Sequence, residues 1–181
     1  MKEIRLHGIG GMGTVKAGEL LVRAAVAAGK YGNSMPFFGF ERQGAPVASY
    51  VRLGDQKIRA KNQVYSPDCV IIQDPSLLIS TPVFEGLKKD SYVILNTRQE
   101  DPRDVVKSPN VRCLAYLDAT AIALNLLGRP IPNTIMLGAF VRATGWVEKE
   151  GVERVVEEVF GTKNVEAFRL GYEEAKIVMF E

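Results

Sequence analysis

Short apolar runs recur through the first two thirds of the chain and predict the strands of a β-sheet. They span Ile4 to His7, Tyr31 to Phe37, Val47 to Leu53, Cys69 to Gln73, Tyr92 to Asn96 and Val111 to Tyr116. Between the first two runs, apolar residues recur at helical spacing from Ala17 to Ala28, and Gly29 then ends the predicted helix. The order of strand, glycine turn, helix and strand is typical of an α/β domain.

Two segments predict the directions of the strands. Leu77 to Lys89 separates the fourth and fifth runs, and we expect Pro82 at the start of a short crossover helix. A crossover helix joins parallel strands, so most of the sheet is predicted to be parallel. Val47 to Leu53 alternates apolar and polar residues and continues through Gly54-Asp55 into Lys57 to Arg59, which predicts an antiparallel hairpin at one edge.

The last third of the chain is predicted to be helical. Ile135 to Ala143 reads as an apolar helix that ends at Gly145, Val152 to Phe160 has an amphipathic pattern, and a last helix is expected from Val165 to Val178. No linker or repeat interrupts residues 1–181, which are therefore expected to form a single domain. The predicted fold is a three-layer α/β/α, Rossmann-like one, with a mostly parallel sheet and an antiparallel edge hairpin.

Composition narrows the class of protein without indicating a substrate. Of the 181 residues, 46% are hydrophobic and 24% are charged, as expected of a globular domain. The formal net charge of +2 gives no reason to expect a nucleic-acid partner. The apolar runs are too short to span a membrane, and Met1 to Ile4 leads into a strand without a signal sequence. A cytoplasmic location is expected.

The two cysteines indicate no cofactor. Cys69 and Cys113 each lie in an apolar run, and no CxxC spacing occurs. Two separated thiols alone hold neither an iron–sulfur cluster nor a structural zinc ion. A disulfide between them remains an alternative, but buried free thiols in a reducing compartment are the expected state.

A glycine turn is the most informative local motif. His7 to Thr14 reads HGIGGMGT, which places G-x-G-x-x-G between the first predicted strand and the first predicted helix. The glycines of this turn are Gly8, Gly10, Gly11 and Gly13. Glycines permit close backbone approach, and the free N–H groups and dipole of the helix favour an anion such as phosphate. The turn is therefore a candidate binding site for a phosphate-bearing ligand.

A dinucleotide is disfavoured at this turn. Dinucleotide sites also use an acidic residue near the end of the second strand, where it binds the ribose hydroxyls. Gly32 to Pro36 contains no carboxylate, and the first one downstream is Glu41. The alternative without a ligand is that the glycines only let the helix pack close to the sheet.

The segment from Phe37 to Pro46 is a second candidate site. It contains three aromatic residues, the charged pair Glu41 and Arg42, and Gly44. Loops at the carboxyl ends of parallel strands gather beside the first glycine turn, so this loop is expected to face the same crevice. The alternative is a solvated ion pair on an ordinary loop.

Several motifs in order carry a resemblance to a known family. They are the glycine turn, Glu41-Arg42-Gln43-Gly44-Ala45-Pro46, Val51-Arg52, Ser66-Pro67-Asp68, Asp74-Pro75, Asp118-Ala119-Thr120, Pro132-Asn133-Thr134 and Leu137-Gly138-Ala139. Together they resemble the gamma family of pyruvate and other 2-oxoacid:ferredoxin oxidoreductases, which includes the small subunit of indolepyruvate:ferredoxin oxidoreductase. The resemblance covers nearly the whole chain.

The resemblance implies one subunit of a larger cytoplasmic enzyme. Such an enzyme decarboxylates a 2-oxoacid on thiamine diphosphate, passes electrons through iron–sulfur clusters to ferredoxin, and transfers the acyl group to coenzyme A. This chain has no Gly-Asp-Gly motif with downstream asparagines for thiamine diphosphate and magnesium, and Gly54-Asp55-Gln56 does not supply one. Those cofactors and the clusters are therefore expected in partner alpha, beta and ferredoxin-like delta subunits. No membrane partner is expected.

Three further residues are candidate site residues. His7 is the only histidine, and its place at a strand end favours a structural, hydrogen-bonded role over proton transfer. Asn133 and Thr134 precede an apolar helix, where capping of its N–H groups accounts for them, with a ligand contact as the alternative. No catalytic residue is expected in this chain.

The expected function is that of a required but non-catalytic gamma subunit. Its cofactor-binding candidates are Gly8, Gly10, Gly11, Gly13, Glu41, Arg42, Gly44, Asn133 and Thr134. The turn is expected to contact the phosphate-bearing part of coenzyme A or a partner loop. The alternatives are a free-standing nucleotide-binding dehydrogenase and a scaffolding subunit without any ligand contact.

Overall fold

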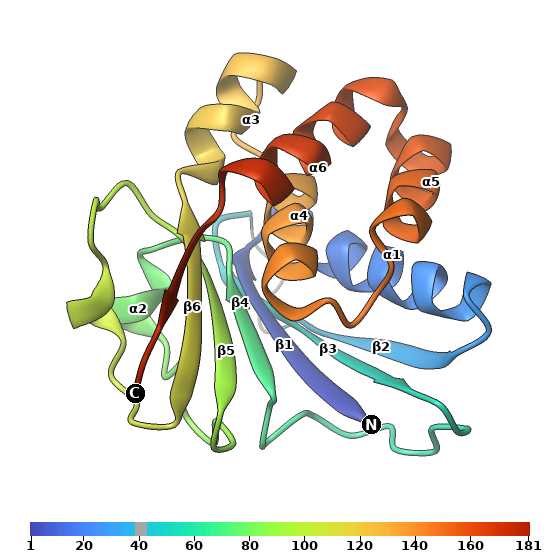
Figure 1. The fold of residues 1–181 in the computed structure, drawn as a ribbon, viewed down its shortest axis with the longest axis horizontal. Coiled ribbons are helices and arrows are strands. Elements are labelled where there is room, and N and C mark those ends of the chain that lie inside the picture. The colour runs from blue at the N-terminus through green and yellow to red at the C-terminus, as the bar shows by residue number, and fades with distance from the viewer. Residues whose placement is uncertain (39–42) are drawn as a thin grey trace.

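One seven-stranded sheet forms the centre of the molecule, in the order β2-β3-β1-β4-β5-β6-β7 (Figure 1). The computed structural model describes residues 1–38 and 43–181. The strands are β1 (Lys2–Ile9), β2 (Tyr31–Phe38), β3 (Pro46–Gly54), β4 (Cys69–Ile72), β5 (Ser91–Asn96), β6 (Val111–Leu117) and β7 (Lys176–Met179). β1, β4, β5 and β6 pair in parallel, whereas β3 is antiparallel to β1 and β2, and β7 is antiparallel to β6.

The main helices lie on one face of this sheet. The helices are α1 (Thr14–Ala27), α2 (Leu77–Ser80), α3 (Ala119–Leu127), α4 (Asn133–Thr144), α5 (Lys149–Phe160) and α6 (Thr162–Glu174), with a 3₁₀ turn η1 (Arg103–Val105). α1, α4, α5 and α6 cover the face nearest the viewer in Figure 1, here called the front face, and the short α2 lies behind the sheet. None of the helices described is long and apolar enough to cross a membrane.

The alternating side chains of the strands supply two hydrophobic cores. On the front face, Ile4, Leu6 and Ile71 belong to one buried cluster with the apolar sides of α1, α4, α5 and α6. On the back face, Val70 and Ile72 belong to a second cluster that includes Leu77 of α2 and side chains of β5 and β6. The central strands are therefore apolar on both faces, as parallel strands covered on both sides require.

The predicted fold class is confirmed. The sheet is largely parallel at its centre, an antiparallel hairpin forms one edge, and helices α3 to α6 make up most of the last third of the chain. The helix after the glycine turn begins at Thr14, and the helix predicted to end at Gly145 is α4. The layer behind the sheet is thin, because α2, η1 and irregular segments form it.

The last helix was predicted to continue beyond the residue at which it ends in the structure. α6 ends at Glu174, and the following segment, Lys176–Met179, pairs as β7 with β6. Val178 and Phe180 then reach the back core, which helical continuation would not allow. The edge of β6 supplies unpaired backbone groups to this segment, so a tertiary contact decides its conformation.

Two smaller predictions about the segments between strands were wrong. The antiparallel hairpin at the edge is formed by β2 and β3, and Lys57 to Arg59 form no strand. The crossover helix α2 spans Leu77–Ser80, so Pro82 follows it instead of starting it. The segment after β3 instead crosses the back of the hairpin, where the amide of Asn33 donates to the carbonyl of Ala60 at 2.9 Å.

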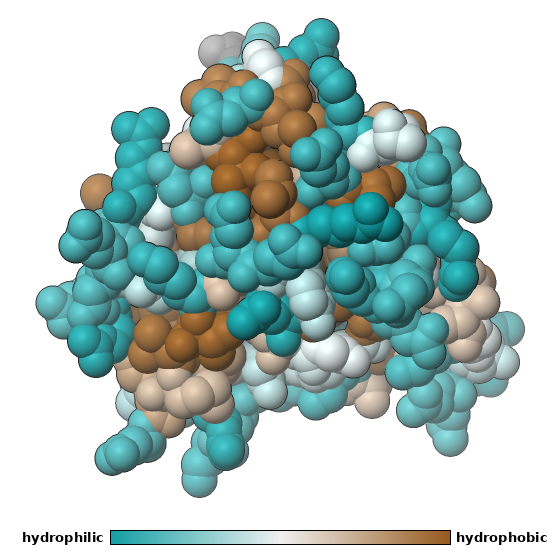
Figure 2. Space-filling model, turned by 45° about the horizontal axis from the view of Figure 1, so that its top comes forward, coloured by the Kyte–Doolittle hydropathy of each residue, from teal (hydrophilic) through white to brown (hydrophobic). Residues whose placement is uncertain are grey.

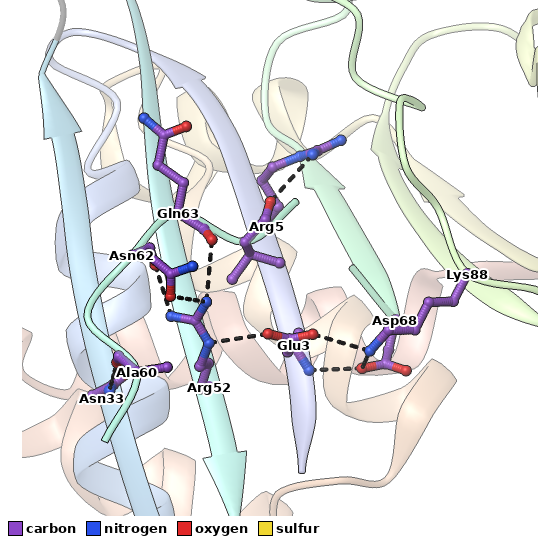
Figure 3. Close-up of polar contacts among 10 residues, drawn as sticks. Glu3, Arg5, Asn33, Arg52, Ala60, Asn62, Gln63, Asp68 and Lys88 are labelled. Carbon is purple, nitrogen blue, oxygen red and sulfur yellow. Dashed lines mark hydrogen bonds and ion pairs between the residues drawn. The ribbon is translucent and has the colours of Figure 1, made fainter. Parts of the chain in front are cut away.

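A network of charged side chains fixes this segment to the amino ends of the strands (Figure 3). Arg52, which is 3% exposed, donates to Glu3 Oε1 at 3.0 Å and to the carbonyl of Asn62 at 2.8 Å. Lys88 then bridges Glu3 and Asp68 at 3.0 and 3.1 Å. The buried guanidinium is therefore both paired and hydrogen-bonded, as a charge at that depth requires.

Candidate functional site

The glycine turn lies at a topological switch point of the sheet. β1 leads through the turn to α1 on the front face, and its parallel neighbour β4 leads to α2 on the back face. Where neighbouring strands connect to opposite faces, a crevice opens beyond their carboxyl ends, and ligands of α/β proteins bind there. The turn therefore has the position that the sequence predicted for it.

A cavity of about 700 Å³ opens beside the turn. Gly10, Gly11 and Gly13 line one part of it, the first turn of α1 from Thr14 to Lys16 lines another, and Val47 lies on the side of β3. Figure 2, in which this end of the molecule comes forward, shows apolar patches exposed among hydrophilic side chains on this face. The cavity has the size of a ligand pocket and combines apolar walls with polar backbone groups.

The beginning of α1 presents unpaired N–H groups to this cavity. Gly13 occupies the N-cap position and supplies no side-chain cap, and the first turn contains no acidic residue. Within the residues described, the N–H groups of Thr14, Val15 and Lys16 have no hydrogen-bond acceptor. Because the helix dipole adds partial positive charge at this end, the site is suited to an anion.

The ammonium group of Lys16 adds a full charge beside these N–H groups. Its Nζ lies 2.7 Å from Glu19 Oε2, and both side chains are about half exposed. An exposed i,i+3 ion pair of this kind contributes less than about 1 kcal/mol, so an anion with several acceptor oxygens can compete for the lysine.

Different structural constraints require glycine at the different positions of the turn. A Cβ at Gly8 would lie 1.9 Å from Thr14 Oγ1, and one at Gly13 would lie 2.4 Å from Asn133 Nδ2. Gly11 has φ near 95° and no atom within 4 Å of its Cβ position, so backbone conformation and not crowding requires glycine there. Packing thus accounts for Gly8, packing and a left-handed backbone with φ near 74° account for Gly13, and Gly11 faces open space.

Both backbone polar groups of Gly10 form hydrogen bonds with the neighbouring loop. Its N–H donates to the carbonyl of Ala45 at 2.9 Å, and its carbonyl accepts from the N–H of Gly44 at 3.4 Å. Gly44 itself has φ near 89°. The two candidate segments are therefore joined by backbone hydrogen bonds. Glu41 and Arg42, the charged pair of that loop, lie outside the described residues.

Asn133 brings α4 against the turn. Its Nδ2 donates to the carbonyl of Gly13 at 3.4 Å, and its Oδ1 accepts the N–H of Thr134 at 2.9 Å. The N-cap position itself is Pro132, so Asn133 accepts a free N–H group from the first position of the helix, whereas Thr134 caps none of the N–H groups described. Thr134 is fully buried and its hydroxyl donates to Asn164 Oδ1 in α6, so it joins two helices away from the cavity wall.

His7 has a structural environment. Arg5 Nε donates to His7 Nε2 at 2.9 Å, so that ring nitrogen is an unprotonated acceptor. Burial, together with the nearby positive charge of Arg5, lowers the pKa of His7 to about 3. The imidazole is neutral at physiological pH, which argues against a role in proton transfer and agrees with the predicted hydrogen-bonded histidine.

A buried polar network beside the turn was missed by the sequence analysis. Thr14 Oγ1 donates to Gln73 Oε1 at 2.7 Å, and Asn96 Nδ2 donates to the carbonyl of Gln73 at 2.8 Å. Asn96 Oδ1 also accepts from the N–H of Ala119 at 2.9 Å at the start of α3. The available signal was that Gln73 and Asn96 are polar residues ending otherwise apolar strand runs.

No titratable cluster of the described part of the chain suggests a metal site. Among residues 1–38 and 43–181, no three His, Cys, Asp or Glu side chains are grouped to hold an ion. Cys69 and Cys113 are buried free thiols, as predicted, and burial raises the pKa of both. Raised pKa values leave these thiols protonated and unreactive.

Comparison with known families decides the relationship of this chain. Residues 3–174 match the sequence model of the family described as pyruvate ferredoxin/flavodoxin oxidoreductase. The chain belongs to this family. The resemblance found from the spaced motifs is thereby confirmed.

Two relatives in the family are similar over their full length. The chain is 47% identical over 180 residues to the pyruvate synthase subunit PorC of Methanothermobacter marburgensis, covering 97% of this chain and 98% of the relative. It is 45% identical over 184 residues to the pyruvate/ketoisovalerate oxidoreductases common subunit gamma of Pyrococcus furiosus, covering 98% of both. The match to subunits named PorC or gamma therefore spans nearly the whole chain.

Solved structures share the fold of this chain. The pyruvate oxidoreductase subunit PORC of Thermotoga maritima is 41% identical, has a TM-score of 0.85, and matches over 97% of each chain. A 2-oxoglutarate:ferredoxin oxidoreductase from Magnetococcus marinus has a TM-score of 0.76 at 18% identity, with 94% of this chain covering 30% of that one. In that larger chain, the same fold is one part of a longer polypeptide.

Proposed function

We propose that this chain is the gamma subunit of a pyruvate or related 2-oxoacid:ferredoxin oxidoreductase. The observation that carries the proposal is the full-length similarity, at 45 to 47% identity, to subunits named PorC or gamma. The reaction of the whole complex is the oxidative decarboxylation of a 2-oxoacid to acyl-CoA with reduction of ferredoxin. The chain works in the cytoplasm as an obligate part of that complex.

The chemistry is assigned to partner subunits. Thiamine diphosphate, magnesium and iron–sulfur clusters belong to alpha, beta and ferredoxin-like delta subunits in this proposal, with ferredoxin as the electron acceptor. Two features of this chain support the division. His7, its one histidine, is held neutral by burial and by Arg5, and its two cysteines lie buried in separate strands, whereas clusters need about four thiolates.

The role proposed for the glycine turn is to contact the phosphate-bearing part of coenzyme A. Three features support a phosphate here: the cavity of about 700 Å³, the unpaired N–H groups of Thr14, Val15 and Lys16 among the described residues, and the Lys16 ammonium group. Coenzyme A supplies the thiol that accepts the acyl group. The chain's own part is to bind and orient the phosphates.

The other candidate residues take supporting roles in this proposal. Gly10 and Gly44 hold the loop against the turn, and Asn133 fixes the position of Gly13. Thr134 acts only by joining α4 to α6. Glu41 and Arg42 are proposed to border the same crevice, and Gly44 and Ala45, at the end of their loop, bond directly to Gly10.

Titration of coenzyme A into the purified complex tests the phosphate contact. Lys16→Glu is expected to raise the Kd for coenzyme A by about tenfold or more, because one charge-assisted contact is lost and a repulsive charge replaces it. Lys30→Glu, which makes the same change of charge at an exposed position beyond the other end of α1, is the matched control and is expected to leave the Kd unchanged.

Two outcomes would contradict parts of the proposal. If Lys16→Glu leaves the Kd for coenzyme A unchanged while the complex stays assembled, the chain is a scaffold without a ligand contact. If the tagged wild-type chain recovers no thiamine-binding and cluster-binding subunits, its membership of such a complex is wrong. In that case, thermal stabilisation of the lone chain by a dinucleotide would identify a free-standing nucleotide-binding protein.

A further inference from the structure

Among the described residues, none of the long helices covers the back of the β2–β3 hairpin. The four long helices α1, α4, α5 and α6 lie on the front of the sheet (Figure 1), and α2 packs behind the parallel strands in the back core. In the described chain, the irregular segment 57–63 crosses the half of the hairpin where β2 begins and β3 ends. The other half, where β2 ends and β3 begins, carries Phe37, Ala48 and Tyr50 on one face by strand register; Tyr50 is only 7% exposed, but Phe37 is left open to solvent.

Aromatic and aliphatic side chains gather on this uncovered half. Phe37 is 47% exposed and its ring lies 6.4 Å from that of Tyr50, and the two line a shallow cavity of about 220 Å³ with Leu77. Ile79, on the same short helix as Leu77, is 94% exposed, and Tyr65 is 67% exposed. Phe37, Tyr50, Tyr65 and Ile79 are here called the rear patch.

Tyr65 belongs to the rear patch through its proximity to Tyr50. The pKa of Tyr50 is raised, first by burial and also by Tyr65, while the nearby Arg5 lowers it. Arg5 is the register partner of Tyr50, and its side chain donates to the carbonyl of Val64, the residue before Tyr65, at 3.4 Å. The patch therefore runs from β2 across β3 to the segment that precedes β4.

A basic strip borders the rear patch. Lys57, Arg59 and Lys61 are exposed and alternate with Ile58 and Ala60, which are partly buried, so the three cations point away from the sheet. Hydrogen bonds from Asn33 and Arg52 hold the strip in place. Among the residues described, no carboxylate lies within ion-pairing distance of these three cations, whereas Arg23 and Arg169 on the helical side are paired.

We propose that the rear patch and the basic strip form the docking surface for another subunit of the oxidoreductase. The inference rests on the proposed function, in which this chain works only within a complex. The partner segment has apolar side chains that cover Phe37 and Ile79, and carboxylates that pair with the three cations. Exposed aromatic clusters with a charged rim are typical of protein interfaces, where the aromatic side chains supply affinity and the charges supply orientation.

A second copy of this chain fits the surface less well than a different partner. A two-fold dimer would place the rear patch against itself, as closed symmetry requires. The basic strips would then face a surface of the same sign, with like-charge repulsion at the contact. An acidic partner turns the same charges into attraction.

Recovery of partner subunits on the tagged chain, expressed together with them, tests the docking surface. Phe37→Glu and Ile79→Glu are expected to lower the recovery of at least one partner subunit by tenfold or more, with the circular dichroism spectrum of the chain unchanged. Leu124→Glu is the matched control, because Leu124 on α3 is also 47% exposed, and it is expected to retain all partners. Ile79 is so exposed that its substitution leaves the core intact.

A second pair of variants tests the basic strip. Reversal of Lys57, Arg59 and Lys61 to glutamate is expected to slow assembly at low salt by tenfold or more and to remove most of its salt dependence. Reversal of Arg129, Arg154 and Lys163, which lie exposed on the helical side, makes the same change in net charge and is expected to leave assembly unchanged.

Each outcome decides between this inference and its alternatives. Full recovery of partners by both Phe37→Glu and Ile79→Glu overturns the docking surface while the proposed function stands. A wild-type chain that recovers no partner overturns the proposed function and the docking surface together. A lone chain that is dimeric, and becomes monomeric with Phe37→Glu, assigns the surface to a second copy and overturns the assignment to a partner subunit.

Discussion

His7 and Arg5 illustrate how one side chain determines the state of its neighbour. The guanidinium group of Arg5 also donates to the carbonyls of Val64, Val83 and Glu85, so it cannot turn away from His7. A protonated imidazole would lose its acceptor nitrogen and face this fixed positive charge. The pair therefore stabilises the fold only while His7 is neutral, which makes the stability dependent on pH.

Substitution of His7 is expected to remove one component of acid sensitivity. The folded-state pKa of about 3 lies below the unfolded value of 6.5, so the unfolded chain takes up the proton first as the pH falls. The contribution of His7 is complete above about pH 6.5 and is lost as the pH falls toward 3, amounting to about 2 kcal/mol between pH 7 and 5. His7→Gln, which keeps an acceptor for Arg5, is expected to lose that amount of pH dependence in urea unfolding. Identical pH slopes for the two proteins would contradict this assignment.

Gly8 is expected to be intolerant of any side chain because of Thr14. The Cβ of Gly8→Ala would lie 1.9 Å from Thr14 Oγ1 and 2.9 Å from Gln73 Oε1, which disturbs their buried hydrogen bond. We expect a loss of about 1 to 3 kcal/mol in the free energy of unfolding. Thr14→Ala relieves the contact, so the double variant is expected to lose less than the two single variants summed. Additive losses in urea unfolding would show that the clash is not the cause.

At the residue scale, the sequence located the turn but not the reasons for its glycines. The motif and its flanking apolar runs were sufficient to place Gly8 to Gly13 between a strand and a helix. The contact of Gly13 with Asn133 joins residues 120 positions apart, so no local pattern encodes it. Gln73 and Asn96 were overlooked for the same reason, because their partners come from other strands and helices.

Helices α4 and α6 approach each other so closely that only glycine fits between them. A Cβ at Gly138 would lie 2.1 Å from the carbonyl oxygen of Phe168, and one at Gly171 would lie 2.0 Å from that of Ile135. Both obstacles are backbone atoms of helices, which cannot rotate aside. The two glycines therefore determine the separation of α4 and α6, and with it the depth at which α4 is buried.

Gly138→Ala is accordingly expected to destabilise the protein although alanine is the better helix former. The helices must separate to accept the methyl group, so we expect a loss of about 3 kcal/mol or more in urea unfolding. Gly151→Ala is the matched control, because it lies in α5 and the nearest atoms to its Cβ position are 3.9 Å away. That variant is expected to gain up to about 1 kcal/mol from helix propensity alone. A similar effect of both substitutions would refute the close-approach argument.

At the scale of elements, periodicity predicted the helices better than their ends. The apolar pattern of α6 continues at helical spacing through Ala175, so nothing local marks Glu174 as the last helical residue. The open edge of β6 pairs with the next four residues, and this pairing decides their conformation. The strand predicted at Lys57 to Arg59 does not form for a related reason. The strand that pairs with the outer edge of β3 is β2, and the segment after β3 is held by the side chain of Arg52 instead.

For the whole molecule, one sheet joins the two cores. The front cluster includes side chains of β1, β3, β4, β5 and β6, and the back cluster uses the opposite faces of β4, β5 and β6. Loss of either cluster therefore exposes strands on which the other depends. The prediction that residues 1–181 form a single domain follows from this shared sheet and remains to be tested.

Calorimetry of the whole chain tests that prediction. A single domain is expected to unfold in one transition whose calorimetric and van't Hoff enthalpies agree, with a heat-capacity change of about 2.5 kcal/mol/K for its 181 residues. Gly138→Ala perturbs the front core, and Arg52→Met removes the charged network behind the sheet. Because both act on one cooperative unit, each is expected to shift the entire transition to lower temperature. If instead either variant shifted only part of the heat absorption, the two faces would unfold separately, and the shared sheet would not couple them.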